Sequence, residues 1–316
     1  MDKWEEKRLL VKVARMYYED EMTQSEIASK TGIYRTTIGR MLKKARDMGI
    51  VTISINSEFD RIFDLEDCLE KKYGMKEIII VPSRRVQSRE ERKKAIGWAG
   101  AHFLKRIVKD GDVVGFAWGT TLAAMIDQLG ECPKRDAHFV PLVGGPGIVD
   151  SKYHVNRIVY TIANAFGGTS YFIDAAAIVE KVETKEEIIN AHYFKKIIEL
   201  WKHLTIAVVG IGAPISSSNL IWTGFFGDKE IEELNQLGAI GDICSRYFDQ
   251  NGNIIYSEIS ERTIAIELDR LKKLKYSIGI AESVEKVPSI IGAMRGKFIN
   301  VLITTEETAE AILKEQ

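Results

Sequence analysis

The stretch DVVGFAWGTTLAAMI, residues 112–126, decides the fold class of this chain. Its first seven residues form a nearly continuous apolar run, which is typical of a strand buried on both faces of a parallel sheet. Gly119 and two threonines follow, and a helical pattern of apolar residues then extends over 120–129. A buried strand joined by a short turn to a helix is the repeating unit of α/β folds.

The same unit recurs on both sides of this stretch. Apolar strand patterns lie at residues 77–81, 138–143, 169–173, 204–212, 276–281 and 298–304. Helical patterns occupy residues 88–109, 153–166, 284–295 and 306–314. This alternation predicts an α/β fold with a doubly wound, mostly parallel sheet, in which ligands bind at the carboxyl ends of the strands.

Three of the predicted strands end in glycine. Gly119 opens a helix beside Thr120 and Thr121, so backbone amides and two hydroxyls are available to a phosphate; a plain glycine turn with threonine caps is the alternative. Gly144–Gly145 and Gly212 end two further strands and face the same edge of the sheet. No lysine follows Gly119 as ATP binding requires, and Ile215 replaces the third glycine of a dinucleotide site. We therefore expect no cofactor.

The composition narrows the class of protein. The chain has 316 residues, 45% of them hydrophobic, and a formal net charge of -1, so any contact with nucleic acid must come from a local patch. The 3 cysteines show neither CxxC pairing nor histidines at metal-ligand spacing, which predicts no metal site. No apolar run approaches the roughly 20 residues of a membrane span, so we expect a cytoplasmic protein.

The first 56 residues are typical of a helix-turn-helix. One amphipathic helix is predicted at 5–19, and Thr23 and Glu26 form the capping box of a second. Gly32 supplies the turn, and a third helix follows over 33–48. Alternating apolar residues from Ile50 to Ile55 predict a β segment that would suit a small wing.

The charges of this region support contact with DNA. Residues 30–50 carry Lys30, Arg35, Arg40, Lys43, Lys44 and Arg46 against the single acid Asp47. Such an excess suits phosphate contacts, and the start of the recognition helix suits base contacts. The predicted base-reading residues are Tyr34, Arg35, Thr36, Thr37 and Arg40, and Gln24 is a candidate for the DNA backbone. A three-helix bundle with a solvated basic face is the alternative.

A charged amphipathic helix is predicted at 57–75, with no proline- or glycine-rich linker before it. It could join two domains rigidly or provide a packing surface for a partner subunit. We therefore divide the chain into a DNA-binding domain, residues 1–56, and an effector-binding and oligomerisation domain, residues 57–316.

Longer stretches resemble one known family. EIASKTGIYRTTIGRMLKKARDMGIVTISI resembles the DNA-binding segment of the SorC family of sugar-responsive regulators. DVVGFAWGTT, FVPLVGG, NRIVYTIANAFGG, AVVGIGAP, GAIGDICSRYFD and IGAMRGKFINVLITTEETA extend the resemblance over nearly the whole chain. The family usually has a small residue, often serine, where this chain has Tyr34 before the recognition-helix arginine.

The resemblance implies a helix-turn-helix that binds double-stranded operator DNA and an effector domain similar to sugar-phosphate isomerases and deaminases. It implies a phosphorylated sugar as effector and assembly as a homodimer or homotetramer. The residues that it implies at the effector site are Gly119, Thr120 and Thr121 for the phosphate, Asp242 for sugar hydroxyls, and Arg295 or Lys297 as the cation paired with the phosphate. Gly144, Gly145, Gly212, Asn156 and Asp174 are further candidates; Asn156 could instead cap a helix, and Asp174 could be a solvated loop acid.

Two alternatives remain beside a sugar-phosphate-controlled regulator. An isomerase or deaminase would need a poised acid/base pair, and only Asp242 stands at a glycine-rich strand end, so we expect no catalysis. A regulator that senses an unphosphorylated polyol is the other alternative.

Overall fold

The structure, a computed structural model, describes residues 3–53, 60–82, 88–147, 151–213 and 227–315. The chain divides into two compact units, Met1–Asp60 and Arg61–Gln316. No helix in these described ranges is long and apolar enough to cross a membrane.

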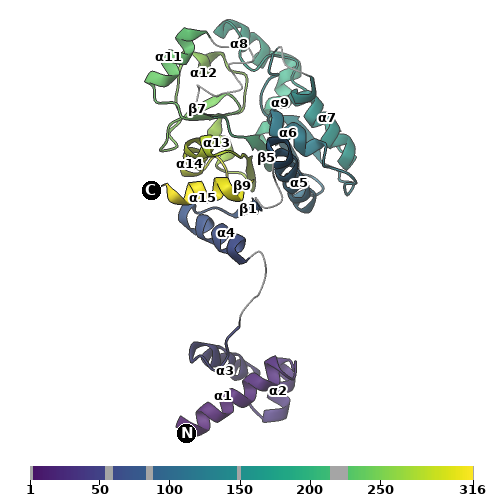
Figure 1. Cartoon of the computed structure of the whole chain (residues 1–316). Coiled ribbons are helices and arrows are strands. Elements are labelled where there is room, and N and C mark those ends of the chain that lie inside the picture. The colour runs from purple at the N-terminus through teal and green to yellow at the C-terminus, as the bar shows by residue number, and fades with distance from the viewer. Residues whose placement is uncertain (1–2, 54–59, 83–87, 148–150, 214–226, 316) are drawn as a thin grey trace. The chain divides into compact units, whose positions relative to one another are not determined.

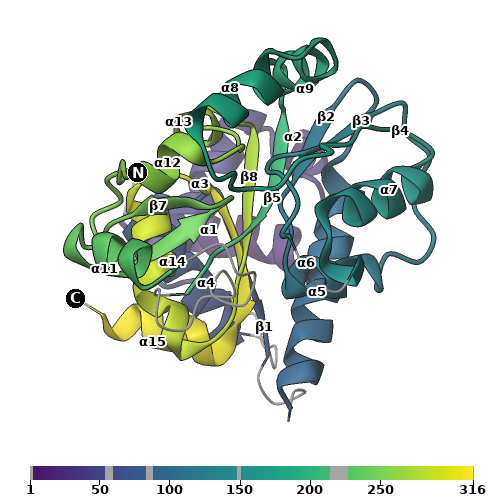
Figure 2. The same cartoon turned by 90° about the horizontal axis from the view of Figure 1, so that it is seen from above.

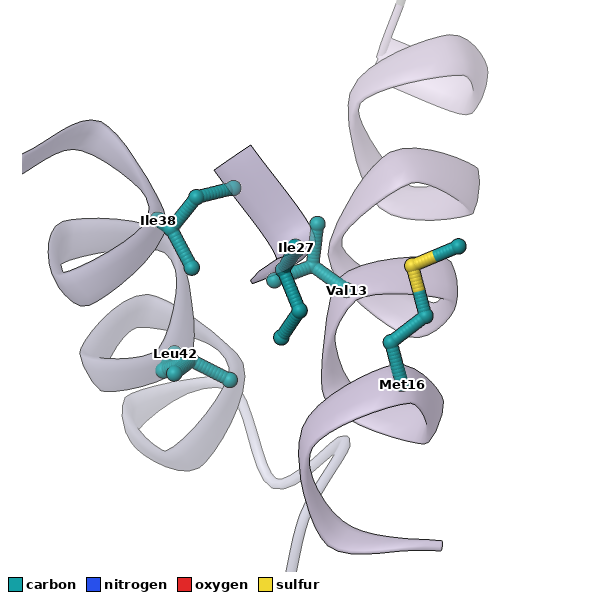
Figure 3. Packing of buried hydrophobic residues seen from close by; sticks show 5 residues of the cluster. All are labelled: Val13, Met16, Ile27, Ile38 and Leu42. Atoms are coloured by element: carbon teal, nitrogen blue, oxygen red, sulfur yellow. The ribbon is translucent and has the colours of Figure 1, made fainter. Parts of the chain in front are cut away.

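The N-terminal unit is a three-helix bundle. Its helices are α1 (Lys3–Tyr18), α2 (Gln24–Thr31) and α3 (Arg35–Asp47). One side chain or two from each helix meet in a small apolar core, which Figure 3 shows: Val13, Met16, Ile27, Ile38 and Leu42. Each of these is at most 8% exposed, so the packing of α3 against α1 and α2 fixes which face of α3 stays in solvent.

The two ends of α2 confirm the local signals in the sequence. The Glu26 amide donates to Oγ1 of Thr23 (3.3 Å), and the Thr23 amide donates to the Glu26 carboxylate (2.8 Å). Gly32 ends α2 with φ +72°, a left-handed conformation that glycine adopts without steric cost. The expected β segment is absent from its described residues 50–53, because Ile50 and Val51 pack against the helices instead; Ile55 lies outside the described residues.

The second unit is built on a seven-stranded sheet in the order β1-β9-β8-β5-β2-β3-β4, with every pairing parallel. The strands are β1 (Glu77–Val81), β2 (Val113–Phe116), β3 (His138–Pro141), β4 (Thr169–Ser170), β5 (Ile206–Gly210), β8 (Tyr276–Ile280) and β9 (Val301–Thr305). The expectation of a doubly wound, mostly parallel sheet is confirmed. Strands β2, β4 and β5 are markedly shorter than predicted.

Helices cover both faces of this sheet (Figure 2). On one face α5 (Arg89–Ile107) packs on α6 (Thr120–Ile126), which packs on α7 (Val155–Phe166); α14 (Val287–Arg295) and α15 (Glu306–Lys314) pack together on the other. Right-handed crossovers explain this arrangement, because connections that run in opposite directions across a sheet must use opposite faces. The direction changes between β5 and β2, and a crevice is expected there at the carboxyl ends of the strands.

The unit contains further short elements. Its other helices are α8 (Val182–Asn190), α9 (His192–Lys202), α11 (Asp228–Gln236), α12 (Glu258–Arg262) and α13 (Leu268–Leu271), and α9 packs against β2. The 3-10 turn Ser151–Tyr153 packs beside α6 and α7, and the turn Val284–Lys286 packs beside α14 and α15. An antiparallel hairpin of β6 (Gly241–Ile243) and β7 (Arg246–Phe248) packs against α14. The hairpin matters for function, because Asp242 is in β6.

Helix α4 (Asp60–Tyr73) closes the outer edge of the sheet at β1 (Figure 1). The Ile78 amide donates to the Glu70 carboxylate (2.7 Å), and the Ile80 amide donates to the Glu66 carboxylate (2.8 Å). Four helical residues rise about 6 Å, and two strand residues span about 6.6 Å, so the two carboxylates match the two outward amides. Burial raises the pKa of Glu66, and the Ile80 amide opposes that rise.

Candidate functional sites

The solvent face of α3 carries most of the predicted DNA contacts. Tyr34 precedes the helix, makes no side-chain cap and is 84% exposed. Arg35, Thr36, Arg40 and Lys43 are exposed, and Thr37 is half-buried. No ion pair with another described residue occupies the charged groups among them, so this face is open to an anionic partner.

Two predicted DNA contacts are partly engaged within the protein. Lys44 forms an ion pair with Glu6 of α1, and its ammonium lowers the pKa of that carboxyl. Gln24 is half-buried, and its side-chain oxygen would lie 3.3 Å from a Cβ added at Gly39 of α3. Gln24 therefore lies at the contact between α2 and α3, and Lys44 helps to join α3 to α1.

A cavity opens where the sheet changes winding direction. It lies at the carboxyl ends of β2, β5 and β8, between the starts of α5 and α6 and the β6–β7 hairpin. The structure brings five predicted effector residues together here: Gly119, Thr120, Thr121, Gly212 and Asp242. The sequence signal was the glycine at each strand end, and the parallel topology places those ends at one edge.

One end of the cavity suits an anion. Gly119 has φ +140°, which an L side chain rarely adopts, and it directs the chain from β2 into α6. The amides of Thr120 and Thr121 start the helix and therefore lack helical acceptors. Arg89 and Lys93, from the first turns of α5, line the same cavity and add positive charge.

The other end is organised around Asp242. The Gly212 amide donates to the Asp242 carbonyl (2.9 Å), and the Ser245 amide donates to the carboxylate (3.1 Å). A Cβ at Gly212 would collide with this carboxylate, so a glycine is required there. Burial raises the pKa of Asp242 to about 6, against opposing effects of the Ser245 amide and Lys286.

Lys286 is the cation beside Asp242. Its ammonium donates to the Ile211 carbonyl (2.9 Å), and burial lowers its pKa although Asp242 and Glu282 oppose the change. Glu282 is only 7% exposed and pairs with Arg92 of α5 at 3.3 Å. The cavity lining thus contains both acids and bases.

Arg295 and Lys297 lie outside the lining of this cavity, so the structure does not bring them together with the other predicted effector residues. Helix α14 starts near the cavity at Lys286 and runs back along the sheet, so its last turn lies toward the opposite edge. There the Arg295 guanidinium donates to the Gln250 carbonyl (3.1 Å). Neither residue lines the cavity.

Four other candidates also lie outside the cavity lining. Gly144 and Gly145 bond through their amides to the Ile264 and Ala175 carbonyls, and a Cβ on either would collide with a neighbour. Asn156 bonds through its side chain to both backbone groups of Ile173 and to the Asp174 carboxylate (3.4 Å).

The geometry gives these four a structural explanation. The two glycines permit close packing of the segment after β3. Asn156 holds the chain after β4, and neither Asn156 nor Asp174 lines the cavity; a contact of either with the effector stays a prediction.

The sequence reasoning missed Arg89, Lys93, Lys286 and Ser245, all of which line the cavity. Lys286 follows the end of β8, and Arg89 opens the helix after β1. Both positions follow a strand whose carboxyl end faces the ligand edge, so the rule that located Gly119 also applied to them.

Comparisons with known proteins agree with this architecture. A family model described as "putative sugar-binding domain" matches residues 57–314. The chain is 40% identical to the sorbitol operon regulator of Klebsiella pneumoniae over 99% of this chain and 100% of that one. It is 32% identical to the deoxyribonucleoside regulator of Bacillus subtilis over 98% and 99% of the two chains.

Solved structures show the same relationship. The crystal structure of the full-length sorbitol operon regulator SorC from Klebsiella pneumoniae superposes with a TM-score of 0.77 at 40% identity, covering 97% of this chain and 99% of that one. That of a probable sor operon regulator from Shigella flexneri gives 0.74 at 39% identity, over 80% and 99%. These curated relatives are transcriptional regulators rather than enzymes. The chain therefore belongs to the SorC family of sugar-binding transcriptional regulators.

Proposed function

We propose that this regulator binds operator DNA through residues 1–56 and that a phosphorylated sugar, bound within residues 57–316, controls its affinity for the operator. The observation that carries the proposal is the cavity at the change of winding direction, where an amide-rich helix start, the half-buried Asp242 carboxylate and the half-buried Lys286 ammonium line the same space.

The phosphate would bind at the start of α6. The Thr120 and Thr121 amides point along a helix axis whose positive end lies there, and their hydroxyls add two donors. Arg89 and Lys93 would offset the phosphate charge. Gly119 makes this geometry possible, because its φ of +140° leaves the backbone open to close approach.

The sugar would extend toward the hairpin. Ionised Asp242 accepts hydrogen bonds from hydroxyls, and the Lys286 ammonium donates to oxygen. The two groups are neighbours, so a ligand oxygen can bond to one while an adjacent hydroxyl bonds to the other. This polar end distinguishes a sugar from inorganic phosphate.

The DNA half of the proposal assigns α3 to the major groove. Tyr34, Arg35, Thr36, Thr37 and Arg40 lie at its start, where helix-turn-helix proteins contact base edges. Exposed Lys43 would contact backbone phosphate. Lys44 and Gln24 would contribute mainly by holding α3 against α1 and α2, since both are engaged there.

Control of operator affinity requires more than one chain. Paired helix-turn-helix units read half-sites about 34 Å apart, so a homodimer or homotetramer is the functional form. The effector would favour one arrangement of the subunits and thereby shift the spacing of the paired units. Light scattering of the purified chain on a size-exclusion column measures this state, and a monomer at every concentration would contradict it.

An unphosphorylated polyol is the second candidate for the effector. Relatives are named for sorbitol and erythritol, and the Asp242 end of the cavity suits hydroxyls in either case. The Gly119–Thr121 turn and Arg89 favour the phosphorylated form, because a neutral polyol supplies no negative charge to these amides and this cation; Lys93 already pairs with Glu90 at 3.6 Å.

The test measures binding of the full chain to a fluorescent fragment of its own promoter by polarisation. Sorbitol 6-phosphate, fructose 6-phosphate and deoxyribose 5-phosphate are added in turn, beside sorbitol, erythritol and inorganic phosphate. We expect at least one sugar phosphate to change the DNA affinity about tenfold, whereas free polyols do not. If only a free polyol acts, the second candidate is correct; if none of the compounds acts, control by a sugar is refuted.

Two variants test in the same assay whether α3 contacts the DNA. Lys43→Ala removes an exposed cation from α3 and should weaken binding and lower the dependence on salt by about one phosphate contact. Arg15→Ala removes an exposed, ion-paired cation from α1 and serves as the matched control. Equal effects of the two would contradict the assignment of α3.

A further inference from the structure

The turn of the β6–β7 hairpin has an unusual backbone. Cys244 and Ser245 join the two strands with φ +55° and +59°. A two-residue hairpin turn with both residues left-handed normally uses asparagine or glycine, because a Cβ is disfavoured there. Such conformations persist where surrounding structure enforces them, and they concentrate at ligand sites.

The side chain of Ser245 lacks a partner among the described residues. The residue is 1% exposed, lines the effector cavity, and its Oγ makes no hydrogen bond there. Its amide donates to Oδ2 of Asp242 (3.1 Å), so Ser245 and Asp242 are neighbours in the lining of the same cavity. Buried hydroxyls are normally bonded, so an unbonded one at a binding cavity indicates a missing ligand atom.

Comparable buried serines in the same unit are bonded. Ser289 donates through Oγ to the Ile240 carbonyl (2.6 Å), and Ser277 donates to the Phe298 carbonyl (2.6 Å). Both hold a helix or a strand in place. Ser245 differs because its hydroxyl holds no described part of the protein.

The neighbouring thiol does not provide a chemical role for the turn. Cys244 is buried, and desolvation together with the Asp242 charge raises the pKa of its thiol. A protonated thiol is a poor nucleophile and a poor metal ligand. The turn therefore serves recognition.

We propose that Oγ of Ser245 hydrogen-bonds to a hydroxyl of the bound sugar that is adjacent to the hydroxyl held by Asp242. This deepens the proposed function and rests on it. The recognised group is a vicinal pair of hydroxyls, one for each side chain, at the end of the ligand remote from the phosphate. Inorganic phosphate binds at Gly119–Thr121 only and does not reach Ser245.

The experiment compares the full chain with Ser245→Ala by calorimetric titration of sorbitol 6-phosphate, fructose 6-phosphate and inorganic phosphate. We expect the variant to bind the sugar phosphate preferred by the unmodified chain about three- to tenfold more weakly, with phosphate unchanged. Its thermal midpoint without ligand should stay equal or rise, because an unbonded buried hydroxyl is removed. The variant would thus lose affinity for the sugar phosphate without losing thermal stability. A purely structural role of Ser245 would not separate these two effects.

Ser289→Ala is the matched control, since it should lower the thermal midpoint and leave sugar-phosphate affinity unchanged. Ser245→Gly, which also relieves the left-handed backbone, serves if the alanine variant does not fold. Unchanged sugar-phosphate affinity in both Ser245 variants overturns the inference while the proposed function stands. If the unmodified chain binds neither sugar phosphate nor any other in the panel, the proposed function itself fails.

Discussion

Two turns line the cavity at the change of winding direction, and they are built in opposite ways. The turn from β2 into α6 uses a glycine at φ +140° and presents backbone amides. The β6–β7 turn uses two non-glycine residues at φ +55° and +59° and presents side chains. Amides recognise an anion whatever it is attached to, whereas side chains can be exchanged one at a time. We infer that the first turn sets the ligand class and the second sets the individual sugar.

The largest effect should follow from a side chain at the first turn. Gly119→Ala forces a Cβ into a conformation that L residues rarely adopt, although no atom lies within 4 Å of it. We expect sugar-phosphate affinity to fall about 100-fold, because roughly 3 kcal/mol of backbone strain is relieved only by moving the amides. Gly111→Ala (φ +83°), before β2 at the opposite edge, should lower stability and leave affinity unchanged. Equal losses of sugar-phosphate affinity in the Gly119→Ala and Gly111→Ala variants would contradict the role given to the first turn.

The Asp242 carboxylate, which accepts a hydrogen bond from the second turn, should make the stability of the protein depend on pH. Because burial raises the pKa of Asp242 from 3.8 to about 6, the folded state binds this proton more tightly than the unfolded state. Its stabilising contribution is complete below pH 3.8 and is lost as the pH rises through 6. Asp242→Asn should therefore gain stability relative to the unmodified chain between pH 4 and 7.5, by about 2 kcal/mol. Urea unfolding at both pH values measures this, and a pH-independent difference would contradict it.

The smallest effect concerns the hydroxyls of the first turn. Thr121→Ala leaves the amides in place and removes one neutral donor, so affinity for the phosphorylated probe should fall about three- to tenfold. Thr121→Ser should restore it. A loss as large as that of Gly119→Ala, in the same calorimetric titration, would show that hydroxyls rather than amides hold the phosphate.

The sheet and the helix-turn-helix were predictable because their signals are local. The capping box of Thr23 and Glu26 and the left-handed Gly32 are short-range features, and both are confirmed. Buried parallel strands are continuous apolar runs, so β2 and β5 could be located from residue type alone. The alternating apolar residues after Ile50 predicted a strand that is absent from residues 50–53, because a few apolar residues can pack against helices as well as in a strand.

Half of the cavity lining could be located only once the topology of the chain was known. The β6–β7 strands have three residues each, and Cys244–Ser245 carries none of the usual turn residues, so the sequence offered no hairpin signal. Lys286 reaches Asp242 only because α14 starts at the ligand edge of the sheet. Arg295 lies away from this cavity for the converse reason, because a helix that follows a strand ends toward the opposite edge of the sheet.

The carboxylates of Glu66 and Glu70 on the amides of β1 have a consequence for the protein at high concentration. An uncovered edge of a parallel sheet accepts strands from other molecules and so promotes aggregation. Here the outward amides of Ile78 and Ile80 are already bonded, by two negatively charged groups that an incoming strand would have to displace. The helix that begins the sugar-binding region thus also protects its sheet from intermolecular growth.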